Sequence, residues 1–367
     1  MEKLGFGLMR LPTVLNNEKK VIDIEELKNM VDTFLENGFT YFDTAWMYCE
    51  FESEKAIKTA LVDRHPRESF KLATKLHAAF LKTKEDRDII FNKQLEKTGA
   101  GYFDYYLIHD IEKEFYTIFE DLDCFNWLMN KKKAGLVKNI GFSFHDSPEF
   151  LDKVLTEHPE MEFVQLQINY LDWESNSIQS RKCYEVARKH NKPIIVMEPV
   201  KGGTLANMPK EAVELFKKYH SDWSVPSWAI RFSAGLDGVF MVLSGMSNMA
   251  QLTDNISYMK GIKPLSQEEK EVAFKAVDII KNSITVPCTG CSYCTDGCPA
   301  NIPIPKYFEI YNEAKRYNGS QKENYKTASD NKGKAGECIG CGQCESVCPQ
   351  HIEIIEHLKG VAKLFEA

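Results

Sequence analysis

The sequence predicts an α/β protein: a closed parallel (β/α)8 barrel, the TIM-barrel fold, followed by a small and mainly helical domain. Over residues 1–263, short runs of β-branched and aromatic residues alternate with amphipathic stretches, which is typical of βαβ units. There are eight such runs, and the stretch has the usual length of a barrel. Eight of the eleven cysteines lie after residue 286, which indicates a second domain of a different kind.

The expected strands are short apolar runs, most of them ending near a polar residue. They are 4–9, 41–43, 70–74, 105–108, 140–143, 163–168, 193–197 and 239–243. The stretches between them repeat apolar residues at helical spacing, and several end just before a glycine, a common helix stop. These expected helices are 24–36, 53–62, 86–98, 117–134, 147–156, 176–190, 210–219, 226–232 and 249–259.

The barrel is expected to be followed by a linker helix. Ser266 with Glu269 three residues later forms a capping box, so a helix is predicted over 266–283. Beyond it, 304–317 has helical spacing and 318–334 is a polar connection. The predicted organisation is a barrel over 1–263, a linker helix over 264–285 and a cysteine-rich domain over 286–367.

The cysteines of the last domain form the same pattern twice, C-x2-C-x2-C-x3-C-P. In this spacing three thiolates bind one [4Fe–4S] cluster, and the cysteine before proline binds the other. The sequence therefore predicts two [4Fe–4S] clusters with crossed ligation, as in a ferredoxin-like domain. One set is Cys288, Cys291, Cys294 and Cys348; the other is Cys338, Cys341, Cys344 and Cys298.

Disulfides and zinc sites are the two alternatives to iron–sulfur clusters for these cysteines. Disulfides are disfavoured, because the chain is long enough for an ordinary core and begins without a secretory signal. Zinc is the stronger rival, since paired CxxC spacings also make tetrahedral sites. Zinc accounts for two cysteines in each run but leaves the third, and the fourth before proline, without a role.

Charge and hydropathy exclude several classes of partner. The net charge is −7, which argues against a nucleic-acid-binding surface. No segment has the apolar length of a membrane span. Thiolate-bound clusters suit a reducing compartment, so a soluble cytoplasmic protein is expected.

Polar residues with complementary chemistry follow the predicted strands. Asp43, Lys75 and His109 stand at the ends of three of them, and Tyr48 lies in the loop after Asp43. In a parallel barrel these ends converge on one mouth. An ammonium near a phenol lowers its pKa, and an aspartate holds the ammonium charged. A histidine can orient a carbonyl oxygen while the tyrosine protonates it, which is the logic of carbonyl reduction.

Four segments, FDTAWMY, LATK, DYYLIHD and IGFSF, together resemble the aldo-keto reductase family over about residues 1–260. The resemblance implies reduction of an aldehyde or ketone by NAD(P)H, or the reverse oxidation of an alcohol. It makes Tyr48 the proton donor, Asp43 and Lys75 its helpers, and His109 the residue that orients the substrate.

The same resemblance implies a set of nucleotide contacts. Ser143 and Gln167 would hold the nicotinamide carboxamide, and Met197 takes the place of a ring that stacks on it. The adenine side would be held by Asp254 and Asn255, with Ser244 as a further contact. Met246 and Gln251 stand where NADPH-selective members carry Lys and Arg, so NADP(H) and NAD(H) both stay open.

The fusion of the two parts leaves two functions open. One is a reductase whose clusters exchange electrons with a ferredoxin-like partner. The alternative is a redox-sensing or electron-transfer binding module in which the barrel is not a nicotinamide-dependent catalyst.

Overall fold

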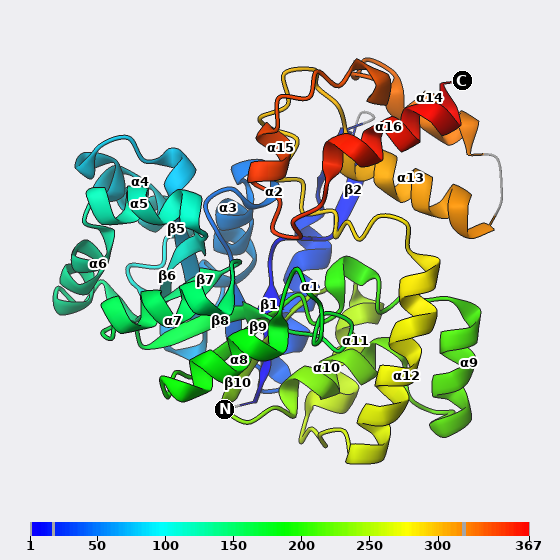
Figure 1. Ribbon diagram of the computed structural model, residues 1–367. Helices are drawn as coiled ribbons and strands as arrows, with labels where there is room; N and C mark the ends of the chain where they lie inside the picture. Colours follow the sequence, from blue (N-terminus) through cyan, green and yellow to red (C-terminus); the bar gives the residue numbers. More distant parts are fainter. Residues whose placement is uncertain (1, 17–18, 318–320, 367) are drawn as a thin grey trace. The chain divides into compact units, whose positions relative to one another are not determined.

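The computed structural model describes residues 2–16, 19–317 and 321–366 (Figure 1). The chain divides into two compact units. The barrel unit comprises 1–174, 179–199 and 227–266, and the C-terminal unit comprises 175–178, 200–226 and 267–367. In the described part of the chain, no helix is both long and apolar enough to cross a membrane.

The barrel unit is built on eight parallel strands that close in the order β1-β10-β9-β8-β7-β6-β5-β4, which confirms the predicted (β/α)8 barrel. Every predicted strand is present; 41–43 has the predicted bounds, and the other strands have at least one shifted end. The strands are β1 (Leu4–Gly7), β4 (Tyr41–Asp43), β5 (Lys71–His77), β6 (Phe103–Ile111), β7 (Val137–Phe144), β8 (Phe163–Gln167), β9 (Ile194–Met197) and β10 (Val239–Gly245).

Side chains that share one face of these strands form a buried cluster. It contains Tyr41, Ala73, Leu107, Phe163, Ile195, Met241 and Leu243. Successive side chains of a strand point to opposite faces, so a residue two positions further on points to the same side. Asp43, Lys75 and His109 are two positions beyond Tyr41, Ala73 and Leu107, and they continue the same face toward the carboxyl ends of the strands.

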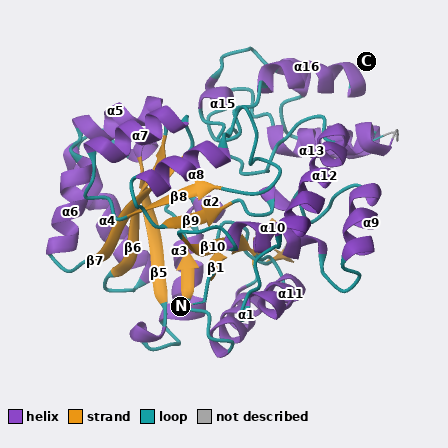
Figure 2. Cartoon of the chain, turned by 60° about the horizontal axis from the view of Figure 1, so that its bottom comes forward, coloured by secondary structure: helices purple, strands orange, loops and turns teal. Residues whose placement is uncertain are grey.

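Helices surround the strands of this unit (Figure 2). Side chains cap several of them: Asp23 accepts a hydrogen bond from the Glu26 N–H, and Ser147 accepts one from the Phe150 N–H. The helices are α1 (Ile24–Glu36), α2 (Tyr48–Phe51), α3 (Ser53–Ile57), α4 (Lys84–Thr98), α5 (Lys113–Asp121), α6 (Cys124–Lys133), α7 (Pro148–Glu157), α8 (Ser180–Lys189), α10 (Val225–Ala234) and α11 (Met249–Met259).

Two predicted helices differ from those in the structure, and one hairpin was not predicted. The single helix expected over 117–134 is two helices, because Asp123 has a left-handed φ of 55° between α5 and α6. The helix expected from 176 starts at Ser180, after Gln179 at φ 53°. An antiparallel hairpin of β2 (Thr13–Asn16) and β3 (Lys19–Ile22) was not predicted, because its residues are almost all exposed and carry no buried apolar pattern.

The C-terminal unit is mainly helical, as predicted. Its buried core joins Tyr307, Phe308, Leu358 and Val361 to cysteines of both runs. Helix α14 lies within the stretch expected to be a polar connection, of which 318–320 lie outside the described residues. The helices are α9 (Lys210–Tyr219), α12 (Gln267–Ser283), α13 (Ile304–Tyr317), α14 (Lys322–Ser329), α15 (Gln343–Ser346) and α16 (Ile354–Phe365).

Candidate active site and cysteine recesses

A buried lysine lies at the centre of the polar residues in the barrel. The Lys75 ammonium donates to Asp43 Oδ1 and to the Thr44 carbonyl oxygen, the latter at 2.8 Å. The Lys75 and Asp43 side chains are 0% and 3% exposed. Strand pairing positions them, since β4 runs beside β5 with Asp43 opposite Ala73. The structure thus brings together the predicted helper residues.

Tyr48 and His109 complete the group. Tyr48 begins α2, and its ring centre lies 5.0 Å from Lys75 Nζ. The Tyr48 and His109 ring centres are 6.0 Å apart, with the rings nearly perpendicular. The four residues predicted from the strand ends therefore lie close together, although Lys75 and His109 lie inside strands that continue for two more residues.

The electrostatics of the group favour a charged lysine and a neutral histidine. Burial lowers the pKa of Lys75, but Asp43 and Tyr48 outweigh it, and the net pKa lies above the ordinary value. Burial raises the pKa of Asp43 against the pull of Lys75. The pair is ionised, because neutralising either partner would leave one charge buried alone. Burial, with His77, Lys75 and His145 nearby, keeps the pKa of His109 well below 6.5.

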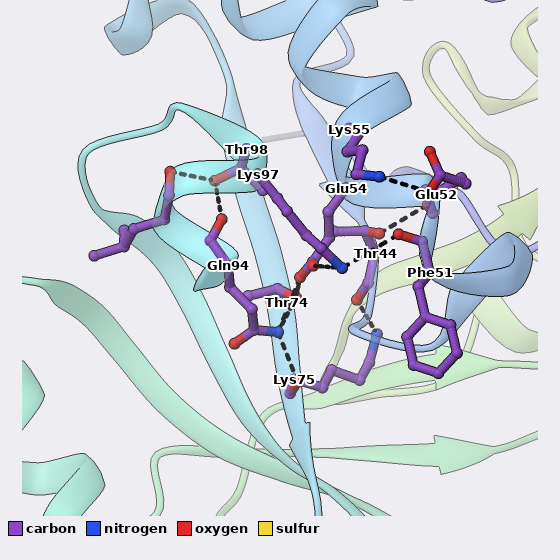
Figure 3. Close-up of polar contacts among 12 residues, drawn as sticks. Thr44, Phe51, Glu52, Glu54, Lys55, Thr74, Lys75, Gln94, Lys97 and Thr98 are labelled. Atoms are coloured by element: carbon purple, nitrogen blue, oxygen red, sulfur yellow. Dashed lines mark hydrogen bonds and ion pairs between the residues drawn. The ribbon is translucent and has the colours of Figure 1, made fainter. Parts of the chain in front are cut away.

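A second buried carboxylate, that of Glu54, is linked by hydrogen bonds to the strand that carries Lys75 (Figure 3). Glu54 Oε1 accepts hydrogen bonds from Thr74 Oγ1 at 2.7 Å and Gln94 Nε2 at 2.9 Å. Gln94 Nε2 also donates to the Lys75 carbonyl oxygen at 3.0 Å. Lys97 Nζ lies 3.8 Å from Glu54 Oε2. This network fixes the backbone of β5 next to Lys75, and sequence reasoning missed it because Glu54 lies on a helix.

The chain after Tyr48 has an unusual backbone. Cys49, Glu50 and Phe51 all have left-handed φ values, of 52°, 55° and 69°. Residues other than glycine adopt this backbone region at a cost of roughly 1–2 kcal/mol each. The Cys49 thiol lies 3.5 Å from the Met9 carbonyl oxygen, which ties this turn to the segment after β1.

A group of two histidines and an aspartate lies beside His109, and its members His77 and Asp110 were not predicted from the sequence. His77 Nε2 lies 3.5 Å from Asp110 Oδ2, and His145 Nε2 lies 3.8 Å from Asp110 Oδ1. The His77 and His109 ring centres are 5.2 Å apart. The available signal was His77, which is two positions after Lys75 and so points to the same side of β5.

The predicted nucleotide contacts already bond within the protein. The Asp110 N–H donates to Ser143 Oγ at 2.8 Å, and Gln167 Nε2 donates to Asp172 Oδ2 at 2.8 Å. Asn255 Nδ2 donates to Ser244 Oγ at 3.0 Å, so the structure brings these two predicted residues together.

The remaining two predicted nucleotide residues lie on separate elements. Met197 ends β9, and its sulfur lies 3.5 Å from Gln165 Nε2. Asp254 lies on α11, next to Asn255.

The eight repeated cysteines gather in the C-terminal unit around two recesses. The first recess is bordered by Cys288, Cys291, Cys294 and Cys348, and the second by Cys298, Cys338, Cys341 and Cys344. Each recess thus takes three cysteines from one run and the last cysteine from the other. This grouping is the crossed arrangement that the spacing predicts.

The residues around the two recesses supply the thiol donors that a thiolate-bound cluster requires. Both are lined mainly by apolar side chains besides the thiols, among them Ile304, which borders both. Among the described residues, no three His, Cys, Asp or Glu side chains are grouped to hold one metal ion. Four thiols bordering an apolar recess match the donor set of an iron–sulfur cube.

Solved structures share the barrel fold. An aldo-keto reductase from Bacillus halodurans (AKR11C1, holo form) has a TM-score of 0.61 and 21% identity, covering 75% of this chain and 91% of its own. An aldo-keto reductase from Klebsiella pneumoniae in complex with NADPH has a TM-score of 0.58 and 15% identity, covering 75% and 91%. An aldo/keto reductase from Brucella melitensis has a TM-score of 0.55 and 21% identity, covering 72% and 99%.

Comparison with known families accounts for both parts of the chain. No match was found among curated proteins. The 4Fe-4S dicluster domain family matches residues 287–353, so a ferredoxin-like iron–sulfur domain follows the barrel. The aldo/keto reductase family matches residues 3–276. This is about three quarters of the chain, which therefore belongs to the aldo/keto reductase family.

Proposed function

We propose that the protein reduces an aldehyde or ketone, or oxidises the corresponding alcohol, with a nicotinamide nucleotide as hydride carrier. The observation that carries the proposal is the buried Lys75 ammonium between Asp43 and the Tyr48 ring. A phenol is a weak acid at neutral pH, and a neighbouring ammonium stabilises its phenolate. Tyr48 can then give its proton to the substrate oxygen.

His109 takes the orienting role in this proposal. Its lowered pKa keeps the imidazole neutral at physiological pH, so it offers one N–H donor and one acceptor nitrogen. A neutral ring can donate to a carbonyl oxygen without competing with Tyr48 as the acid.

The nucleotide is NADP(H) or NAD(H), with contacts proposed at Ser143, Gln167, Met197, Ser244, Asp254 and Asn255. The bound NADPH of the Klebsiella pneumoniae reductase supports a nucleotide in this fold. The nucleotide, when bound, supplies the hydride; the residues of the chain bind it and move the proton.

We assign each recess one [4Fe–4S] cluster with crossed ligation, as the grouping of the cysteines supports. Such clusters, when bound, carry one electron each. The proposed partner is a ferredoxin-like protein, because such a protein also transfers single electrons. Thiolate ligands favour a reducing compartment, which supports a cytoplasmic location. We take 264–285 as the linker between the catalytic barrel, 1–263, and the cluster domain, 286–367.

The test is Tyr48→Phe, assayed without oxygen with NADPH and NADH against 4-nitrobenzaldehyde and 9,10-phenanthrenequinone as probes. We expect kcat to fall by about 10²–10⁴-fold, the usual contribution of a positioned proton donor. Nucleotide affinity should stay within twofold of the wild type. Tyr184→Phe is the matched control, since its hydroxyl bonds the Asp237 carbonyl oxygen at 2.9 Å, away from Lys75. Unchanged turnover in Tyr48→Phe would favour the redox-sensing alternative.

A further inference from the structure

A buried lysine touches the wall of the first cysteine recess. Lys201 opens a short turn, Lys201–Gly203, in the C-terminal unit and is 4% exposed. Its ammonium donates to Gln350 Oε1 at 2.8 Å. Gln350 is 5% exposed, follows Cys348 by two residues and borders the first recess. The lysine is thus one side chain away from the space that the four thiols enclose.

The turn is packed tightly against the other side of the same recess. A Cβ on Gly202 would lie 2.3 Å from the Thr289 carbonyl oxygen and 2.7 Å from Thr289 Cα. Gly202 also has a φ of +59°, which favours glycine. Thr289 follows Cys288 and borders the recess. The Lys201–Gly203 turn therefore contacts both chain segments that carry Cys288 and Cys348.

A positive charge in this place has an electrostatic consequence. A cluster with four thiolates is an anion, and reduction by one electron adds a further negative charge. The potential of such a cluster depends on net charge and hydrogen bonding around it. A buried ammonium acts more strongly than one in water, because the surroundings have a low dielectric constant. Gln350 accepts the Lys201 hydrogen bond without carrying a charge of its own.

The second recess offers an internal comparison. The described lining of neither recess includes a charged side chain, and that of the second includes Ile339, which is 71% exposed. The Lys201–Gly203 turn contacts Thr289 and Gln350, which border the first recess and do not border the second.

We propose that Lys201 is a positioning and charge-setting residue for the first recess. It holds Gln350 in place and favours the one-electron-reduced state of the cluster bound there. The proposal rests on the assignment of clusters to the recesses made above. The electron comes from a one-electron donor, and no bond forms or breaks at Lys201.

The experiment compares Lys201→Met, Lys201→Gln and Lys201→Arg in the full-length protein. Iron and sulfide contents are measured first. Dithionite titrations with mediators, followed by electron paramagnetic resonance, then give both midpoint potentials. Cys291→Ser and Cys341→Ser assign each signal to a recess. Lys210→Met, on the surface of α9, is the control for loss of a lysine charge; the Lys210 side chain is 85% exposed.

We expect the two neutral variants to disfavour reduction of the first cluster by about tenfold or more, which is about 59 mV for one electron. Lys201→Arg and Lys210→Met should change the reduction equilibrium of the first cluster by less than about threefold. The midpoint potential of the second cluster should stay the same in all variants. Full iron with unchanged potentials in Lys201→Gln would overturn the inference. Absence of iron in the wild type would instead overturn the cluster assignment on which it rests. If Lys201→Met loses iron, the Lys201→Gln titration decides.

Discussion

Lys75 is the residue on which the polar group of the barrel depends. Its fully buried ammonium faces the Asp43 carboxylate, so each charge is tolerable only because of the other. An isolated charge in such a place costs several kcal/mol, whereas a paired one costs little. The same residue therefore serves the proposed chemistry and the folding of the barrel.

Lys75→Met is expected to lower the free energy of unfolding by about 3–5 kcal/mol, because Asp43 is left buried and unpaired. Asp43→Asn should cost a similar amount. The double variant should cost clearly less than the sum, which a double-mutant cycle in urea measures. Lys71→Met, at a lysine 39% exposed and 3.6 Å from Asp104, is the control. Additive costs would show that Lys75 and Asp43 are not coupled.

Glu112 gives stability an unusual dependence on pH. Burial, with Asp110, Asp146 and Glu114 nearby, raises its pKa from 4.5 to about 9. Between these values the unfolded chain has released the proton and the folded chain still holds it. Folding therefore weakens as pH rises through this range, by up to about 1.36 kcal/mol per pH unit.

Glu112→Gln should remove this penalty. We expect the variant to gain stability over the wild type as pH rises from about 5 to about 8, by at least about 1 kcal/mol. Urea unfolding at several pH values measures the difference. Glu211→Gln, which removes an acidic residue from the first turn of α9, is the control. A difference that does not grow with pH would contradict a protonated Glu112.

At the scale of elements, the strands were predictable because burial on both faces leaves a continuous apolar run. The break between α5 and α6 was not, because 117–134 has helical spacing throughout. A tertiary interaction lies at the break: Arg87 on α4 donates hydrogen bonds to the carbonyl oxygens of Leu122 and Asp123, the latter at 3.0 Å. The Asp123 carbonyl oxygen also accepts a hydrogen bond from the Trp127 N–H at 3.1 Å, which is the first helical bond of α6.

Arg87→Met should therefore lower the free energy of unfolding by about 1–3 kcal/mol, since two carbonyl groups lose a charged donor. Thermal or urea unfolding measures it. Lys93→Met removes an exposed lysine from the same helix and should change stability by less than about 0.5 kcal/mol. Equal effects of the two variants would show that Arg87 does not hold the break.

The residues of the candidate site could be predicted only where a local sequence pattern marks them. Asp43, Lys75 and His109 could be found because each lies near a strand end with a fixed alternation of faces. The role of Asp110 could not, because its left-handed φ of 63° interrupts that alternation within β6. Glu54 lies 21 residues before Lys75 and is linked to it through Thr74 and Gln94, a connection that no local pattern encodes.

At the scale of the whole chain, the proposed function combines two kinds of electron chemistry in one protein. A nicotinamide passes two electrons as a hydride, and each cube passes one. The C-terminal unit also depends on its cysteines for packing, because Cys294, Cys344 and Cys348 are part of its buried core. Each recess is bordered by cysteines of both runs, so under the proposed ligation the loss of iron from one recess frees cysteines of each run.

Removal of iron is therefore expected to unfold the cluster-bearing part while the barrel persists. Anaerobic treatment with a chelator and ferricyanide should make the chain after Ser283 sensitive to a protease, since structural metal binding contributes folding free energy. The barrel has its own buried core, so its segments 4–174, 179–199 and 227–259 should stay protected, as identified by mass spectrometry. The untreated protein under the same protease is the control. Digestion of the barrel at the same rate as the cysteine-rich segment would mean that the clusters stabilise both parts.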